Sequence, residues 1–325
     1  MLKQGECISL RNALPRLEST PMQQSPIIRP PRLQKGDMVG IISPAGPVEE
    51  AELGPGLDFL DQRGYKVRIG SHALSKKGYL AGDDSARLED FHAMIRDREV
   101  HAVFCTRGGY GTMRVLDRID YDLVRDNPKI MAGFSDITAL LLSLFAKAGM
   151  VTFHGPMVRQ VKDIGIGNFS ALLDLVETPG EHTIELTGAR TLVSGTAKGV
   201  LIGGNLCLLS HLVGTPFLPP LEGNILFLED RGEPLYRIDR MLTHLRLAGH
   251  LDRISGLIAG QFEDCGEPGA MDDLLFRFAK DLSVPVVSGA PLGHGNSNIP
   301  LPLGVQAELR TTIPWLRLLE PAISS

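Results

Sequence analysis

The stretch Ile130-Met-Ala-Gly-Phe-Ser-Asp-Ile-Thr-Ala139 joins a short apolar run to the start of a strongly periodic segment. The run at residues 129–133 has the length and composition of a buried strand. Gly149 is placed to end the helix that follows. This strand, turn and helix indicate an α/β protein. The apolar residues of the expected helix, at the i, i+3, i+4, i+7 spacing, are Ile137, Leu140, Leu141, Leu144, Phe145 and Ala148.

The segments before this stretch repeat the same alternation. Residues 38–43, 66–70 and 101–105 are short apolar runs that predict buried strands, and helical patterns lie between them. Strand, helix and strand units of this length form right-handed crossovers between parallel strands. We therefore expect an N-terminal α/β domain with a mostly parallel sheet over residues 34–165.

The pattern weakens in the middle of the chain and then resumes. Residues 166–192 mix glycine, threonine and glutamate without a long apolar period, so we interpret them as a linker or crossing segment. Beyond them, residues 225–228, 256–260 and 284–288 predict strands with helices between them, and the tail is expected to add further strands. Residues 193–325 are therefore expected to form a smaller C-terminal α/β domain with β-rich parts.

Residues 1–33 differ in composition from the rest of the chain. They contain five prolines among polar and basic residues and show no sustained apolar period. Such a segment does not bury enough apolar surface to fold by itself. We interpret it as a flexible extension that precedes the folded part.

Composition and charge exclude several classes of protein. The chain has 325 residues, a formal net charge of −5 and no long basic run, so the charge pattern of a nucleic-acid-binding protein is missing. No stretch reaches the ~18 apolar residues that a membrane span requires, and residues 1–35 lack the apolar region of a secretory signal. The four cysteines are scattered without a CxxC pair, which fits free thiols in a reducing compartment. We expect a cytoplasmic protein that binds neither nucleic acid nor membrane.

Ser135 lies at the turn between the predicted strand and helix. A serine on such a turn exposes its hydroxyl beyond the sheet edge, and the next backbone N–H, that of Asp136, can stabilise an oxyanion at the helix N-terminus. The second glycine of the G-x-S-x-G elbow is replaced by Ile137. Ser135 and Asp136 could equally cap the helix, which is the more common use of these residue types. Both interpretations stay open from this segment alone.

A second candidate is the loop Thr106-Arg-Gly-Gly-Tyr-Gly111, which follows a predicted strand. Its glycines allow backbone N–H groups to approach a ligand or an oxyanion closely. The loop lacks the lysine of the Walker pattern and does not match G-x-G-x-x-G, so a nucleotide phosphate is disfavoured as its ligand. A tight turn explains one or two of the glycines, and less readily three beside Arg107.

A serine nucleophile needs a base, and two of the nine histidines lie on glycine-rich turns after apolar runs. These are His154 and His294, and the loop around His294 is the richer in polar residues. Catalytic groups are usually held on such loops. The other histidines have polar or helical surroundings and are interpreted as structural or solvated: His72, His92, His101, His182, His211, His244 and His250.

The carboxylate that would orient the base is sought after the buried strand at residues 225–228. Glu229 follows it directly, at the sheet edge where ligands bind. Asp230 and Glu233 compete for the same role, and all three acids could instead stabilise the N-terminus of the next helix. Neither a His-x-x-x-His motif nor paired cysteines occur, so the sequence predicts no metal site and no cofactor.

Several motifs occur in a fixed order along the chain. Together they resemble the LD-carboxypeptidase family, also called muramoyltetrapeptide carboxypeptidases, which includes the microcin-immunity peptidases. The likeness extends from about residue 33 to residue 319. The motifs are the opening Lys35-Gly-Asp-Met-Val-Gly-Ile-Ile-Ser-Pro-Ala-Gly-Pro47, the loop Thr106–Gly111, Gly133-Phe-Ser-Asp-Ile-Thr138, Gly203-Gly-Asn-Leu206, Leu226-Phe-Leu-Glu-Asp230, Tyr236-Arg-Ile-Asp-Arg-Met-Leu242, Gly293-His-Gly-Asn-Ser-Asn298 and Leu301-Pro-Leu-Gly304.

The resemblance implies a catalytic triad of Ser135, Glu229 and His294. Ser135 would attack a peptide carbonyl, His294 would take its proton and pass it to the leaving amine, and Glu229 would hold the imidazole in its working tautomer. The backbone N–H groups of Asp136 and Gly109 would bind the oxyanion. In the family fold the serine lies in the N-terminal domain and the other two residues in the C-terminal domain, so the triad would assemble at their interface.

The resemblance also implies a substrate and an assembly state. The substrate would be a murein tetrapeptide, cut before its terminal D-alanine during cell-wall recycling, and the enzyme would be a homodimer without cofactor. Arg107, Arg231 and Arg237 are candidates to bind the substrate carboxylate, although each could equally form a surface ion pair. The alternatives are a microcin-immunity peptidase acting on aminoacyl-nucleotide peptides, a non-catalytic α/β protein that binds a small molecule, and a nucleotide-dependent transferase.

Overall fold

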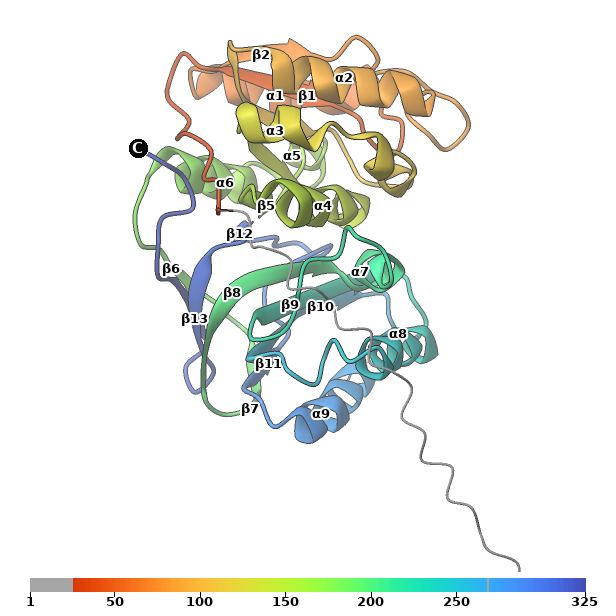
Figure 1. The fold of residues 1–325 in the computed structure, drawn as a ribbon, viewed down its shortest axis with the longest axis vertical. Coiled ribbons are helices and arrows are strands. Elements are labelled where there is room, and N and C mark those ends of the chain that lie inside the picture. Colours follow the sequence, from red (N-terminus) through yellow and green to blue (C-terminus); the bar gives the residue numbers. More distant parts are fainter. Residues whose placement is uncertain (1–25, 268) are drawn as a thin grey trace, which may run out of the picture.

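The computed structural model describes residues 26–267 and 269–325. Its strands form two sheets, one in the upper and one in the lower half of Figure 1, and α4 (Thr138–Ala148) contacts strands of both. The α/β class that the sequence predicts is confirmed.

The first sheet is built mainly from the N-terminal half. Its strands β1 to β5 run parallel, and β12 from near the C-terminus pairs antiparallel with β5. β1 and β3 are neighbouring parallel strands, so the loops that follow them lie side by side at the carboxyl edge of the sheet. This is the edge where α/β proteins bind their ligands. The order across the sheet is β12 (Leu301–Leu303), β5 (Thr152–His154), β4 (Ile130–Gly133), β3 (Val100–Cys105), β1 (Met38–Ile42) and β2 (Lys66–Ile69).

The second sheet has eight strands and is mixed. The four central strands, β8 to β11, run parallel, and the strands that flank them are antiparallel. The order is β6 (Thr183–Glu185), β14 (Trp315–Leu318), β13 (Gln306–Arg310), β8 (Thr196–Asn205), β9 (Ile225–Arg231), β10 (Gly256–Glu263), β11 (Val286–Ser288) and β7 (Arg190–Val193).

Helices connect the parallel strands in both halves. Each crossover carries one main helix, as the alternating sequence pattern predicts. In the first half these helices are α1 (Glu50–Gln62), α2 (Asp84–Arg96), α3 (Tyr121–Asp126) and α4. In the second half they are α7 (Leu206–Leu212), α8 (Leu235–Leu247) and α9 (Ala270–Leu282).

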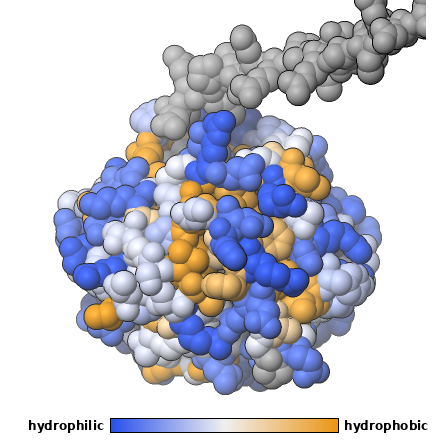
Figure 2. All heavy atoms as spheres, turned by 90° about the horizontal axis from the view of Figure 1, so that it is seen from below, coloured by the Kyte–Doolittle hydropathy of each residue, from blue (hydrophilic) through white to orange (hydrophobic). Residues whose placement is uncertain are grey.

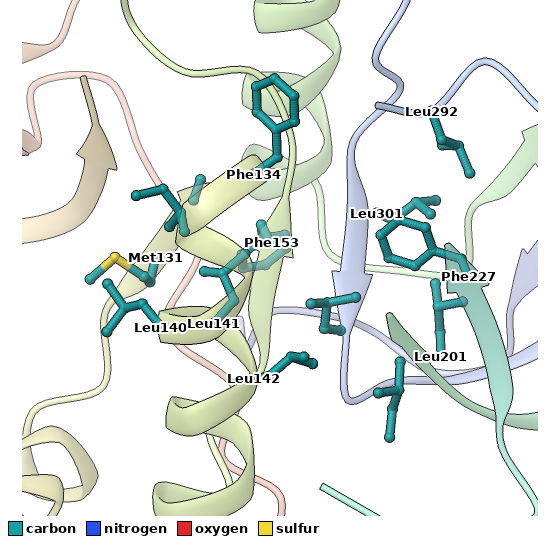
Figure 3. Close-up of a cluster of buried hydrophobic side chains, with 14 of the residues drawn as sticks. Met131, Phe134, Leu140, Leu141, Leu142, Phe153, Leu201, Phe227, Leu292 and Leu301 are labelled. Carbon is teal, nitrogen blue, oxygen red and sulfur yellow. The ribbon is translucent and has the colours of Figure 1, made fainter. Parts of the chain in front are cut away.

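Helix α4 lies at the centre of the molecule and is buried on nearly all sides. Figure 3 shows Leu140 beside Met131 of β4, and Leu142 on the side that faces Leu201 and Phe227 of the second sheet. A helix that is apolar all round is stable only when both of its faces are covered. Its C-terminal residue is followed by Gly149 at φ 71°, the left-handed position expected from the sequence.

The segment interpreted as a linker or crossing segment contains regular structure, so it is not a simple linker, and it leads from the first half of the molecule to strands of the second sheet. Residues 166–192 contain α6 (Gly167–Glu177) and β6, and α5 (Gln160–Ile164) precedes them. Phe169 of α6 is fully buried, with its ring centroid 6.1 Å from that of Phe59 and 5.6 Å from that of Phe104. The buried apolar residues of this helix, from Phe169 to Val176, have the i, i+3, i+4, i+7 spacing, so the segment does carry a local helical signal.

The end of the predicted extension also belongs to the fold. The Ile28 N–H donates to the Gly149 C=O at 2.8 Å, and the Leu33 N–H donates to the Val176 C=O at 2.9 Å. Leu33 is only 1% exposed. Flexibility was therefore wrongly assigned to residues 26–33, whereas residues 1–25 lie outside the described part of the chain.

Strand β12 departs from the expected division of the chain at residues 165 and 193. It belongs by sequence to the C-terminal segment, yet Leu301 pairs with His154 and Leu303 with Thr152 in the first sheet. This pairing covers the edge of β5, whose backbone groups would otherwise be unpaired. The chain therefore crosses between the two sheets more than once.

The lower end of the molecule in Figure 1 is seen face-on in Figure 2, where hydrophobic residues lie in several groups among hydrophilic ones. Leu247 of α8 and Phe276 of α9 are large apolar side chains that stay exposed. Over residues 26–267 and 269–325, no helix has the length and apolar character needed to cross a membrane.

The burial of Phe169 predicts that α6 contributes directly to stability. Phe169→Ala should lower the free energy of unfolding by about 3–5 kcal/mol, because it leaves a cavity beside two aromatic rings. Ile166, which is 53% exposed, provides the control, and Ile166→Ala should change the same quantity by less than about 0.5 kcal/mol. Urea unfolding of both variants measures the difference, and equal losses would contradict the packing role of α6.

Candidate active site

Ser135 occupies the sharp turn between β4 and α4. Its φ of 63° is a left-handed value that is strained for a residue other than glycine and is found mainly at functional sites. Gly133 permits this turn, since a Cβ there would lie 2.8 Å from the Ile137 side chain. The Ser135 hydroxyl caps neither α4 nor the short 3₁₀ turn Ser135–Ile137, so the capping interpretation was wrong for this residue.

The Ser135 hydroxyl reaches His294 instead. His294 Nε2 lies 3.0 Å from Ser135 Oγ, and His294 Nδ1 lies 2.7 Å from Glu229 Oε2. With the proton on Nδ1, the imidazole donates to the carboxylate and accepts from the serine hydroxyl. The imidazole also packs against the Phe134 ring at a centroid distance of 4.8 Å, which limits its rotation.

Glu229 lies within β9, two residues before the strand ends, and its side chain is completely buried. Gly293 makes room for it, since a Cβ on Gly293 would be 2.5 Å from Glu229 Oε2. The other carboxylate oxygen, Oε1, is buried without a partner in the described residues. A buried carboxylate with one hydrogen bond favours a positive charge on the group that donates to it. Glu229 can therefore stabilise His294 when the imidazole is protonated.

The two competing acids point elsewhere. Asp230 accepts hydrogen bonds from Asn205 Nδ2 and the Cys207 N–H, both at 2.9 Å, and its burial raises the pKa of the carboxyl to about 6. Glu233 forms an ion pair with Arg237 at 3.3 Å. Of the three carboxylates that the sequence left open, Glu229 is the one that contacts His294.

His154, the other candidate base, is the last residue of β5 and does not lie on a turn as expected, and it does not contact Ser135. It is fully buried, and its Nε2 lies 3.1 Å from Asn298 Oδ1, which also accepts the Gly293 N–H at 3.0 Å. Burial lowers the pKa of His154 to about 4, so the ring is neutral near pH 7. His154 therefore supports the loop that carries His294. Asn298 closes the motif Gly293–Asn298, but no role was expected for this residue.

The glycine loop after β3 lies directly against the serine. A Cβ on Gly108 would be 2.9 Å from Ser135 Oγ and 3.5 Å from the Asp136 nitrogen. The Gly46 N–H donates to the Gly108 C=O at 3.1 Å. Because C=O and N–H point in opposite directions across a trans peptide, this bond directs the Gly109 N–H away from Gly46. Gly46, in the loop after β1, was not singled out from the sequence.

None of the three candidate arginines bonds to Ser135, His294 or Glu229 in the described part of the chain. Arg107 borders the glycine loop and donates to the Pro47 C=O at 3.2 Å. Arg231 is more than half exposed and lies 3.7 Å from Asp264.

Arg237 is also more than half exposed and lines a cavity of about 420 Å³ between α7 and α8.

No group of three or more His, Cys, Asp or Glu side chains within the described ranges could hold a metal ion.

Two models of protein families match this chain. The model of the LD-carboxypeptidase N-terminal domain matches residues 39–155, and that of the LD-carboxypeptidase C-terminal domain matches residues 198–309. The probable murein peptide carboxypeptidase of Bacillus subtilis is 39% identical over 294 residues, which cover 87% of this chain and 92% of the relative.

Two further proteins extend the comparison. The crystal structure of muramoyltetrapeptide carboxypeptidase from Oxalobacter formigenes superposes with a TM-score of 0.77 at 29% identity, covering 86% of this chain and 98% of the other. The microcin C7 self-immunity protein MccF of Escherichia coli is 29% identical over 322 residues, covering 88% and 93%. The two domain models account for more than half of the residues, and the chain belongs to the LD-carboxypeptidase family.

Proposed function

We propose that this protein hydrolyses the LD peptide bond before the terminal D-alanine of murein tetrapeptides, with Ser135, His294 and Glu229 as its catalytic triad. The observation that carries the proposal is the continuous chain of contacts from Ser135 Oγ through the imidazole to the buried carboxylate. The murein peptide substrates named for the Bacillus and Oxalobacter relatives support the choice of substrate.

The proposed reaction has two steps. Ser135 Oγ attacks the scissile carbonyl while its proton moves to His294 Nε2, and the imidazolium is stabilised by Glu229. Collapse of the tetrahedral intermediate breaks the C–N bond, and the proton passes from His294 to the D-alanine amine. Water then attacks the acyl ester while one of its protons moves to His294. The bond from the acyl carbon to Ser135 Oγ breaks as His294 returns that proton to Oγ, and the tripeptide leaves with its new carboxyl group.

The negative charge that develops on the substrate oxygen requires hydrogen-bond donors. Asp136 lies in the 3₁₀ turn Ser135–Ile137, which continues as α4, so its N–H is at the N-terminal end of a helical segment. The N–H of Gly109 has no acceptor within residues 26–267 and 269–325. Two backbone donors next to an attacking serine form the usual site for such an oxyanion. We assign the oxyanion site to these two groups.

The first test is release of D-alanine from an L-Ala-D-Glu-meso-diaminopimelate-D-Ala tetrapeptide in the presence of EDTA. Ser135→Ala should lower kcat/KM by at least ~10³-fold, because it removes the nucleophile while leaving the oxyanion donors. Ser71→Ala, a change at an exposed serine, is the control and should retain wild-type activity. Wild-type activity that disappears with EDTA, or that survives Ser135→Ala, would refute the proposed mechanism.

A second candidate substrate follows from the microcin C7 self-immunity relative. If the folded wild-type chain releases no D-alanine from the tetrapeptide, hydrolysis of an aminoacyl-nucleotide peptide should be assayed with the same two variants. Cleavage that depends on Ser135 would keep the triad and replace the substrate. Inertness toward both substrates would leave the non-catalytic binding protein as the better explanation.

The low pKa of His154 predicts that this residue, unlike a general base, does not titrate in the pH range of the reaction. Because His154 stays neutral above about pH 4, it contributes no titration to kcat/KM between pH 5 and 8. His154→Gln keeps a donor toward Asn298 and should lower kcat/KM without moving the midpoint of its pH profile by more than ~0.3 units. A shift of one unit or more would mean that His154 itself titrates during catalysis.

A further inference from the structure

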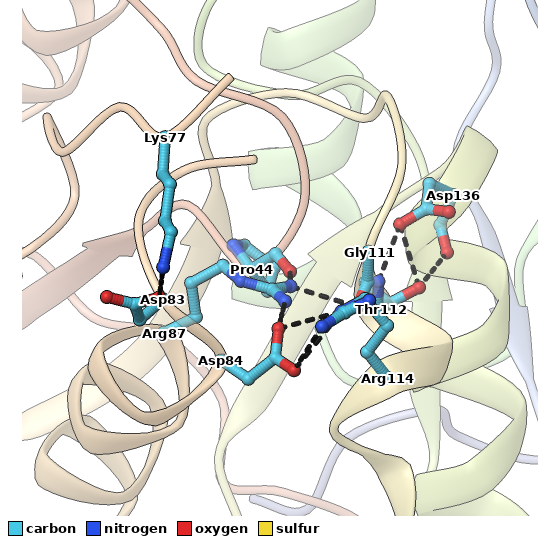
Figure 4. Close-up of polar contacts among 9 residues, drawn as sticks. All are labelled: Pro44, Lys77, Asp83, Asp84, Arg87, Gly111, Thr112, Arg114 and Asp136. Carbon is cyan, nitrogen blue, oxygen red and sulfur yellow. Dashed lines mark hydrogen bonds and ion pairs between the residues drawn. The ribbon is translucent and has the colours of Figure 1, made fainter. Parts of the chain in front are cut away.

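Arg87 is a buried cation close to the active site that the proposed triad does not use. It lies on α2, and its side chain is only 1% exposed. One guanidinium nitrogen, Nη1, donates to the Pro44 C=O and also to the Gly111 C=O at 2.9 Å (Figure 4). A buried charge is strongly unfavourable unless it is paired and hydrogen-bonded. Here the partner is Asp84, whose carboxylate also binds Arg114 at 2.8 Å near the surface.

The two carbonyls that Arg87 binds belong to the two loops that meet beside Ser135. Pro44 leads into Gly46, whose N–H holds the Gly108 C=O. Gly111 ends the glycine loop with a φ of 134°, and a Cβ at this residue would lie 2.7 Å from Arg87 Nη1. The guanidinium therefore occupies the space that a side chain at residue 111 would need. Arg87 thus links the loop after β1 to the loop after β3 through hydrogen bonds to one carbonyl of each.

Asp136 holds the end of the same loop through hydrogen bonds with Thr112. Its carboxylate accepts the Thr112 N–H at 2.9 Å, and the Thr112 hydroxyl donates to the Asp136 C=O at 2.6 Å (Figure 4). The side chain is 3% exposed, and its burial raises the pKa of the carboxyl while the Thr112 hydrogen bonds lower it. Asp136 follows the nucleophile directly in the chain, so the end of the glycine loop is bonded to the residue next to Ser135.

We propose that Arg87 and Asp136 are positioning residues that hold the Gly108–Gly109 peptide in place for the oxyanion, an inference that rests on the proposed function. A loop with three glycines among six residues has few side chains to pack and many accessible conformations. Oxyanion donors are effective only when they are already oriented before the reaction. Arg87 and Asp136 hold the C-terminal end of the loop through Gly111 and Thr112. Arg87 also binds the Pro44 C=O, in the loop whose Gly46 N–H binds the Gly108 C=O.

The experiment compares Arg87→Lys and Asp136→Asn with Arg114→Met. Arg114 binds the same Asp84 carboxylate but contacts neither loop carbonyl, so it is a matched control for the ion pair. Arg87→Lys and Asp136→Asn should lower kcat for D-alanine release by ~10–100-fold with KM changed less than ~3-fold, whereas Arg114→Met should stay within ~3-fold of wild type. Circular dichroism and thermal unfolding establish that each variant is folded.

A second readout does not depend on the peptide substrate. A fluorophosphonate reacts by forming a bond from Ser135 Oγ to phosphorus while fluoride leaves, and the phosphoryl oxygen occupies the oxyanion site. The rate of labelling should fall in the Arg87 and Asp136 variants by about the factor seen for kcat. If the wild type is labelled but releases no D-alanine, the proposed substrate is wrong, and the labelling rates still decide the positioning role.

Three results would overturn the proposal. The first is unchanged kcat and labelling in folded Arg87→Lys and Asp136→Asn, and the second is a raised KM at constant kcat, which would indicate ground-state binding. The third is a loss in Arg114→Met as large as in Arg87→Lys, which would indicate a general effect of the ion pair. If Arg87→Lys does not fold, kcat and the labelling rate are measured for Thr112→Val instead. This change removes the hydroxyl bond to Asp136 and leaves the Arg87 ion pair intact, so unchanged values would overturn the proposal.

Discussion

The hydrogen bond from the Asn205 N–H to the Thr138 hydroxyl, at 3.1 Å, joins the two sheets at the point on which the site depends. Thr138 is the first residue of α4, three residues after Ser135, and Asn205 is the β8 partner of Glu229 in β9. The chains approach closely because residue 204 is glycine, since a Cβ there would lie 2.5 Å from the Thr138 methyl group. This close approach therefore holds the turn of Ser135 near the strand that carries Glu229.

The third member of the site is held by both sheets as well. His294 lies on the loop between β11 of the second sheet and β12 of the first, so each end of its loop is anchored to a different sheet. The buried apolar side chains in Figure 3 pack between α4 and the strands of the two sheets. In such a buried environment Glu229 interacts with a protonated imidazole more strongly than it would in water. The same packing that stabilises the fold therefore also surrounds the contact between His294 and Glu229.

The sequence was sufficient for those parts of the molecule whose pattern is local. The turn at Ser135 and the helix that ends at Gly149 were predicted from periodicity and residue type, and both are present. The choice of Glu229 over Asp230 was not decidable from the residues alone, because neighbouring residues of a strand point to opposite faces and the sequence does not say which face meets His294. Helix α6 carries the same kind of local signal, because its buried apolar residues from Phe169 to Val176 have helical spacing. The glycine, threonine and glutamate residues around them led instead to the expectation of a linker or crossing segment.

The burial of Arg87 could not be predicted from the sequence pattern of its helix. On α2 it stands among charged residues, and a helix with this composition is normally taken to be solvent-exposed at that position. Its burial follows from the two carbonyls that converge on it from loops more than 20 residues away on either side. An oxyanion site made of glycine backbone has no side chains of its own to fix it, so its geometry has to be imposed by residues from other elements. Those residues carry no local motif, and in this protein only the three-dimensional arrangement of α2, the loop after β1 and the loop after β3 identifies them.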